Sequence, residues 1–255
     1  MAKIERVAPS FQEKIWGSTG LAPWFPEPET KIGEVWFDSP HLPLIKFLFT
    51  TERLSVQVHP WDEFAREHEG SNGKTEMWHI LRAAPGAKVA AGFREPATPE
   101  AVRDAALSGT IEAMLNWVQV RPGDSIFIPA GTVHAIGAGL SLCEIQQHSD
   151  VTYRIYDYGR ARELHLDKGI AVANLGTCPA RAALPVRCPY FHTEKLEVRG
   201  ELQKDASEKI TGLIVLQGEG LINGEPFLAG EVYELPAGES LSIRGNGTIL
   251  RTYIP

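Results

Sequence analysis

The sequence has few cysteines, no long apolar run and no excess of positive charge. Its 255 residues include three cysteines, Cys143, Cys178 and Cys188, in unrelated contexts and without a Cys-x-x-Cys pair. This usage predicts free thiols in a reducing, cytoplasmic setting. No segment approaches the length of a membrane-spanning helix, and the first residues lead into no apolar signal segment. We therefore expect neither membrane insertion nor secretion.

The charge balance limits the class of partner. A formal net charge of −7 argues against nucleic acid and against an anionic membrane, because proteins that bind those surfaces concentrate lysine and arginine. A small phosphorylated ligand is still compatible, since it needs only a few cations gathered locally, such as Lys74 and Arg154. The content of 43% hydrophobic and 22% charged residues predicts a globular protein with a buried core.

Most of the chain shows the pattern of strands, with short apolar runs interrupted by glycine and proline. The clearest predicted strands cover residues 44–49, 54–58, 75–81, 124–129, 141–147 and 151–156. Residues 98–107 instead predict a helix, capped by Thr98 with Pro99 at its first position and ended by Gly109, and about 111–116 a second. We expect a mainly β fold with a small helical insertion at about 93–117.

A weak internal repeat divides the chain. The segment Pro122–Gly131 aligns without gaps with Ala229–Gly238, and both contain glycines, an acid, an apolar run and Pro-Ala-Gly. The proline-containing stretch Thr177–Pro189 separates the two copies. This pattern predicts two β units, 1–184 and 185–255. His134 of the first copy aligns with Leu241 of the second, so the second unit is expected to be structural.

Four side chains form a candidate metal site. Gln57 and His59 lie two residues apart in an apolar strand, so they share one of its faces, where buried polar atoms are costly unless a ligand satisfies them. Glu76 and His134 come from other predicted strands. Two oxygen donors and two imidazoles suit zinc, iron, manganese or cobalt. Taken singly, His59 could be a strand-end histidine, Glu76 a surface acid and His134 a loop residue.

The combined motifs resemble the cupin superfamily and, more closely, the type I mannose-6-phosphate isomerases, over about residues 10–175. The motifs that carry this resemblance are Gln57–Pro60, Lys74–Trp78, Pro129–Ala135 and Ser149–Arg154, with Trp16-Gly17 and Gly33–Trp36 near the N-terminus. The resemblance implies a bicupin of two jelly-roll units, the second without metal ligands. The sequence departs from some members, which place a histidine where this chain has Gly73.

The resemblance further implies an activity and roles for the site residues. It implies reversible isomerisation of mannose 6-phosphate and fructose 6-phosphate through an enediol, with one zinc ion on Gln57, His59, Glu76 and His134. Arg154 would stabilise charge on the substrate oxygens. Glu144 or Lys74 would transfer the proton.

Simpler interpretations of these catalytic candidates stay open. Glu144 could be a structural buried acid, Lys74 a solvated loop lysine, and Arg154 an ion-pair partner of Asp150 or Asp157. Three functional alternatives also stay open: an isomerase of another sugar phosphate, a metal-dependent cupin dioxygenase, and a non-catalytic sugar-binding cupin.

Overall fold

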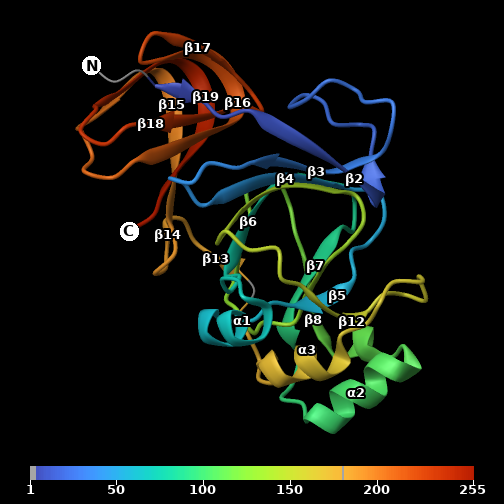
Figure 1. Cartoon of the computed structure of the whole chain (residues 1–255). Coiled ribbons are helices and arrows are strands. Elements are labelled where there is room, and N and C mark those ends of the chain that lie inside the picture. Colours follow the sequence, from blue (N-terminus) through green and yellow to red (C-terminus); the bar gives the residue numbers. More distant parts are fainter. Residues whose placement is uncertain (1–3, 180) are drawn as a thin grey trace. The chain divides into compact units, whose positions relative to one another are not determined.

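The computed structural model describes residues 4–179 and 181–255, and its contacts divide the chain into two compact units (Figure 1). One unit contains the described residues up to Lys14 together with Ser18–Phe47 and Ala183–Pro255. The other contains Ile15–Gly17 and Leu48–Ala182. The first strands of the chain therefore group with the C-terminal segment, whereas the sequence interpretation placed them in a unit covering residues 1–184.

The unit containing residues 48–182 is built on two groups of antiparallel strands. A five-stranded sheet has the order β12 (Tyr153–Tyr156), β5 (Val56–Val58), β10 (His134–Ile136), β7 (Lys88–Phe93) and β8 (Leu115–Gln119). A second group follows the order β13 (Arg181–Ala182), β9 (Ser125–Ile128), β6 (Glu76–Ala83) and β11 (Leu140–Gln146). Strand β4 (Leu44–Thr50) crosses the boundary between the two units. These elements confirm the predicted mainly β class.

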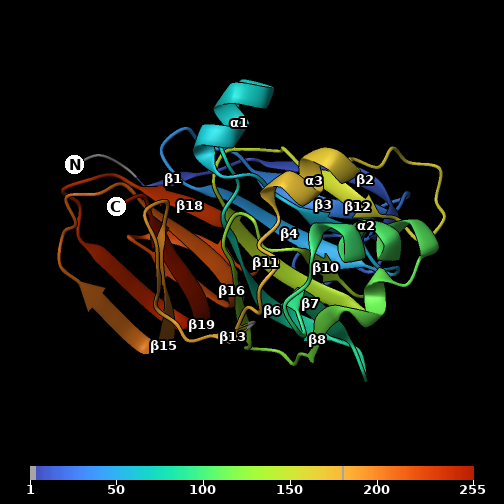
Figure 2. The same cartoon turned by 90° about the horizontal axis from the view of Figure 1, so that it is seen from below.

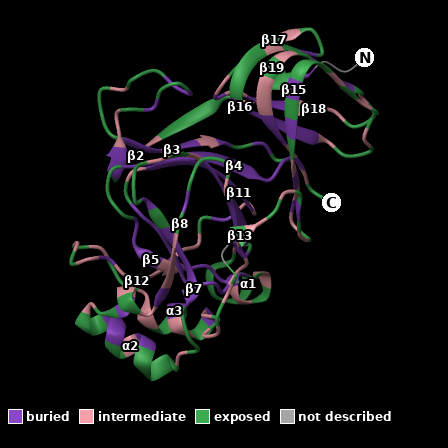
Figure 3. Cartoon of the chain, turned by 180° about the vertical axis from the view of Figure 1, so that it is seen from behind, coloured by how far each residue is buried: buried purple, intermediate pink, exposed green. Residues whose placement is uncertain are grey.

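Two apolar cores hold this unit together, one on each face of the five-stranded sheet. Val89 and Ala91 of β7 pack with Ile80 of β6 and Leu142 of β11, so this core joins the two groups of strands. Ala90, which points to the opposite face of β7, packs in a second cluster with residues of the helices. Figure 3 shows the strands largely buried and the outer sides of the helices exposed.

Three α-helices belong to this unit: α1 (Asp62–Glu69), α2 (Pro99–Ser108) and α3 (Leu166–Val172), with α2 and α3 close together in Figure 2. Helix α2 starts as predicted, since the Thr98 hydroxyl accepts a hydrogen bond from the Ala101 N–H, and Gly109 ends it with φ of 76°. The second helix predicted at about 111–116 is wrong in its extent: only Ile111–Ala113 are helical, as a short 3₁₀ turn, and strand β8 begins at Leu115. No helix in the described part of the chain is long and apolar enough to cross a membrane.

The other unit is also a β structure. Its main sheet has the order β1 (Glu5–Arg6), β18 (Val232–Leu235), β16 (Thr211–Ile222), β19 (Leu241–Tyr253), β15 (His192–Lys204) and β14 (Val186–Arg187), and β17 (Glu225–Leu228) pairs with β16. Strands β2 (Pro9–Ser18) and β3 (Ile32–Phe37) pair with each other. An apolar cluster that includes Val215, Phe227 and Ile249 forms the core of the main sheet.

The two repeated segments have the same local backbone geometry. Gly123 and Gly230 both have φ of 92°, and their N–H groups donate to Ile80 O (2.8 Å) and Val215 O (2.9 Å). The N–H groups of Ile80 and Val215 donate in return, each at 2.9 Å, to the residue that follows the respective glycine. In both copies these bonds lead into a short strand, β9 or β18. The sequence repeat therefore corresponds to a repeated turn and strand.

Candidate active site

Strand register places three of the predicted site residues in one row across the five-stranded sheet. Gln57 of β5 is paired with His134 of β10 on one side and with Arg154 of β12 on the other. Directly paired residues point to the same face of a sheet. The row therefore gathers an amide, an imidazole and a guanidinium that are far apart in the sequence.

The second group of strands supplies carboxylates. Within the antiparallel pair of β6 and β11, Glu76 is opposite Gln146 and Trp78 is opposite Glu144. The Glu76 carboxylate extends to both imidazoles, with Oε1 3.5 Å from His134 Nε2 and Oε2 3.5 Å from His59 Nε2. Glu76, His59 and His134 are each at most 1% exposed. The three side chains therefore form one buried cluster.

Both imidazoles have a defined orientation. The Nδ1 atom of His59 lies 2.8 Å from Val151 O, and that of His134 lies 2.8 Å from Thr132 O. A backbone carbonyl can only accept, so each Nδ1 carries a proton and donates it, which turns each Nε2 towards Glu76. Burial lowers the pKa of His134 to about 4, which keeps the ring neutral at physiological pH.

These donors suit a divalent metal ion. One ligand atom from each of His59, Glu76 and His134 can be chosen so that all lie within 4.8 Å of one another. Two neutral imidazoles and a carboxylate are a common donor set for zinc and related metals. Gln57 is adjacent: its Nε2 lies 3.2 Å from His134 Nε2, and its Oε1 accepts from the Ser55 hydroxyl at 3.2 Å. Turning the amide by 180° would bring the oxygen to the cluster.

A buried lysine connects this cluster to Glu144. The Nζ atom of Lys74 lies 3.0 Å from Glu76 Oε2 and 3.9 Å from Glu144 Oε1. The indole N–H of Trp78 donates to Glu144 Oε2 at 2.9 Å. Lys74 is only 5% exposed, so its interpretation as a solvated loop lysine is wrong. The structure therefore places a second carboxylate and a cation directly beside the candidate metal ligands.

Arg154 is held by the backbone and not by an aspartate. Its Nη1 donates to Glu163 O at 2.8 Å, while Asp157 accepts from the guanidinium groups of Arg160 and Arg162. The alternative of an ion pair between Arg154 and Asp157 is therefore wrong. Burial lowers the pKa of Arg154. Its buried Nε has no hydrogen-bond partner within residues 4–179 and 181–255, so one donor remains available.

Sequence reasoning missed one polar residue of the site. Gln146 is fully buried beside Glu76, and its Nε2 donates to Ser149 O at 2.6 Å and to Gln147 O at 2.8 Å. Its Oε1 is buried without a hydrogen-bond partner in the described part of the chain. The signal was present in the alternation of residues 142, 144 and 146, which puts Gln146 on the same face as Glu144.

Gly73 shows why a histidine cannot occupy this position in the present backbone. A Cβ atom on residue 73 would lie 2.6 Å from the Asp62 nitrogen and 2.8 Å from Pro60 O. Both are main-chain atoms that cannot turn aside. The N–H of Gly73 also donates to Asp62 Oδ1 at 2.8 Å. The close approach fixes the start of the segment that carries Lys74 and Glu76.

The fold and the site together define a mainly β protein with a buried His/Glu cluster suited to a metal ion, bordered by lysine, arginine and a second carboxylate. Comparison with known proteins specifies this class. The chain is 33% identical to mannose-6-phosphate isomerase ManA of Bacillus subtilis over 290 residues, which covers 90% of this chain and 92% of the relative. The chain belongs to the mannose-6-phosphate isomerase family. No family model matches it.

Other relatives agree with this assignment. A mannose-6-phosphate isomerase of Streptococcus mutans is 35% identical over 215 residues, covering 78% of this chain and 66% of the relative. The crystal structure of the mannose 6-phosphate isomerase from Bacillus subtilis superposes with a TM-score of 0.90 at 28% identity, over 99% of this chain and all of that one. A putative mannosephosphate isomerase from Archaeoglobus fulgidus, at 20% identity and a TM-score of 0.86, shares the fold.

Proposed function

We propose that this protein is a metal-dependent aldose-ketose isomerase that interconverts mannose 6-phosphate and fructose 6-phosphate. The observation that carries the proposal is the buried cluster of His59, Glu76 and His134 in contact with Lys74, in a chain of this family. The reaction moves a proton between C1 and C2 of the sugar through an enediol. It needs a base at carbon and positive charge near the oxygens.

The metal site would be formed by His59, Glu76 and His134, with Gln57 as the fourth ligand. Zinc is the metal that the resemblance favours, and when bound it would supply Lewis-acid stabilisation of the developing oxygen charge. The protein's contribution is to hold both Nε2 atoms by hydrogen bonds from Nδ1 to the backbone. Each ring is thereby fixed in the tautomer that a metal requires.

Proton transfer is assigned to Glu144 or Lys74. The Trp78 indole holds one oxygen of Glu144, which orients the carboxylate towards the same buried region as Glu76. The ammonium of Lys74 lies within 4.0 Å of both carboxylates and lowers the cost of burying their charges. Arg154, from the neighbouring sheet, would place its guanidinium near the substrate oxygens.

The repeated turn and strand support a bicupin organisation. We propose that the catalytic jelly-roll cupin expected within residues 1–184 is carried by residues 48–182. Residues 185–255, with which the first strands of the chain group, would form a degenerate second cupin. Leu241 stands where the first copy has His134, and Thr211 or Gly212, depending on the alignment, where it has Glu76, so the second copy would lack these ligands. The cysteines Cys143, Cys178 and Cys188 are free thiols, which supports a cytoplasmic location.

A coupled assay with mannose 6-phosphate tests the proposal. Activity should be lost on chelation and return with zinc. His134→Ala should lose bound metal and activity together, whereas His68→Ala, which changes an exposed histidine on α1, should keep both. Full activity in protein shown to contain no metal would refute the metal-dependent mechanism.

Substrate and oxygen measurements separate the alternatives. A higher kcat/KM with another aldose phosphate would reassign the substrate within the same chemistry. Oxygen uptake without isomerisation would favour a dioxygenase. Sugar binding without turnover would favour a binding protein.

A further inference from the structure

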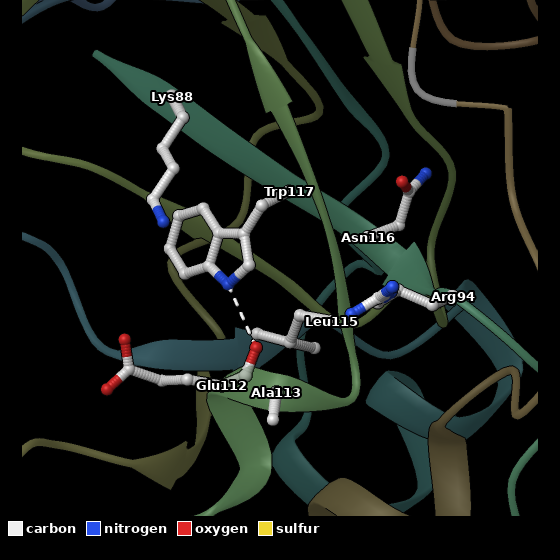
Figure 4. A pocket seen from close by; sticks show the side chains of 7 residues that line it. All are labelled: Lys88, Arg94, Glu112, Ala113, Leu115, Asn116 and Trp117. Atoms are coloured by element: carbon white, nitrogen blue, oxygen red, sulfur yellow. Dashed lines mark hydrogen bonds between the residues drawn. The ribbon is translucent and has the colours of Figure 1, made fainter. Parts of the chain in front are cut away.

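A hollow lies in the unit containing residues 48–182, on the outer side of the five-stranded sheet. It has a volume of about 500 Å³ and is lined by Lys88, Arg94, Glu112, Ala113, Leu115, Asn116 and Trp117 (Figure 4). Trp117 is paired with Ala90, and His134 is paired with Ala91. Adjacent residues of a strand point to opposite faces. The indole therefore lies on the side of the sheet away from the candidate metal ligands.

The hollow has more positive than negative charge to offer a ligand. Its one carboxylate, Glu112, is bound to Arg53 through a contact of 2.6 Å between Oε2 and Nη1. In Figure 4 this carboxylate extends away from the guanidinium of Arg94. Within the described residues, the side chain of Arg94 has no hydrogen bond or ion pair. The ammonium of Lys88 lies over the Trp117 ring, 4.6 Å from its centroid.

Trp117 gives the hollow a rigid wall. Its indole N–H donates to Glu112 O at 3.0 Å, which fixes the ring, as the dashed line in Figure 4 shows. An aromatic face of this kind packs against the C–H faces of a sugar or another ring. Arginine adds a planar fork of donors that suits a phosphate group. A cation and an aromatic wall in one hollow are the elements of a site for a small phosphorylated compound.

We propose that this hollow is a second binding site, distinct from the isomerase site, for a small phosphorylated metabolite. The phosphate binds to Arg94, and the body of the ligand lies along Trp117 towards Lys88. Trp117 and His134 lie on opposite faces of the sheet. A ligand can therefore occupy this site without displacing the isomerase substrate.

Nuclear magnetic resonance of the indole N–H groups tests the site in the intact, metal-loaded protein. Trp117→Phe identifies the Trp117 signal. Glucose 6-phosphate, inorganic phosphate and glucose are then titrated separately at low ionic strength, because salt screens exposed charges. We expect a saturable shift of the Trp117 signal with glucose 6-phosphate, a weaker one with inorganic phosphate and none with glucose.

Charge substitutions provide the decisive comparison. Arg94→Gln should weaken binding of glucose 6-phosphate by about tenfold, the loss expected for one charge-assisted hydrogen bond. The matched control Arg199→Gln, at an exposed arginine of β15, should titrate like the unaltered protein. Isomerase activity of Arg94→Gln without added glucose 6-phosphate should stay unchanged, so failure of this site is distinguishable from failure of the proposed function. An unmoved Trp117 signal, or equal affinities of the two variants, would overturn the proposal.

Discussion

Arg154→Lys tests the least obvious assignment in the isomerase site. Arg154 uses Nη1 to bond Glu163 O at 2.8 Å, and its Nε stays buried with no partner in the part of the chain described. The guanidinium can therefore hold the backbone and present a second donor at the same time. A lysine carries its charge on a single nitrogen and cannot reproduce this fork. The substitution keeps the charge and removes the geometry.

The expected loss follows from the position of Arg154 beside Gln57 in the sheet. A preorganised donor in a water-poor site contributes about 3 kcal/mol to the transition state, which corresponds to about a 100-fold decrease in kcat. KM should change much less, because the charge on the substrate oxygens develops only as the enediol forms. Metal content should be unchanged. The measurement is steady-state kinetics with mannose 6-phosphate, together with metal analysis.

Two outcomes would contradict this reasoning. A loss confined to KM would show that Arg154 binds the phosphate, since ground and transition states would then be affected equally. Kinetic constants close to those of the unaltered protein would remove Arg154 from the site. Arg103→Lys is the matched control, because Arg103 lies on α2 and its guanidinium pairs with Asp167 at the surface. It should leave both constants unchanged.

Two further predictions concern the tight backbone packing at Gly73 and the stability of the protein at acidic pH. Gly73→Ala should reduce isomerase activity at least about tenfold, because its Cβ would meet the Asp62 nitrogen at 2.6 Å and displace Lys74. Gly20→Ala is the control, because a Cβ atom at that position has room. Equal activities of the two variants would contradict the prediction. Chelated protein should lose about 3 kcal/mol of stability as the pH falls from 6.5 towards 4, because only the unfolded state readily protonates His134. Denaturant titrations across this pH range measure the loss of stability. An equal loss in chelated His134→Gln would show that another group causes it.

The sequence predicted several strands of the site because their apolar alternation is strong, but none of the predicted strand ranges covers the three-residue β10 (His134–Ile136). The predicted strand at residues 75–81 corresponds to β6 (Glu76–Ala83), and helix α2 begins and ends at its predicted caps. Helix α3 (Leu166–Val172) was not predicted. It is only seven residues long, contains Gly169 and has no side-chain cap at His165, so its local signal is weak. Packing against the five-stranded sheet stabilises it instead.

The candidate site was predictable in its residues but not in its pairings. Alternation within a strand places Gln57 and His59 on one face, but it does not say which strands are neighbours. Register supplies that information: Arg154 lies beside Gln57, and Gln146 lies beside Glu76. These contacts join residues far apart in the chain, so no local pattern contains them. For Gln146, local alternation indicates the face that it shares with Glu144, and only the register shows that it lies beside Glu76.

Lys74 makes the proposed metal-binding and proton-transfer groups one electrostatic unit. Its ammonium lies 3.0 Å from Glu76 and 3.9 Å from Glu144, and all three side chains are at most 5% exposed. The low local dielectric strengthens the interaction of this shared cation with each carboxylate. A proton taken up by Glu144 therefore alters how strongly Lys74 is held by Glu76. This coupling connects a carboxylate that could accept the substrate proton to the one that would bind the metal.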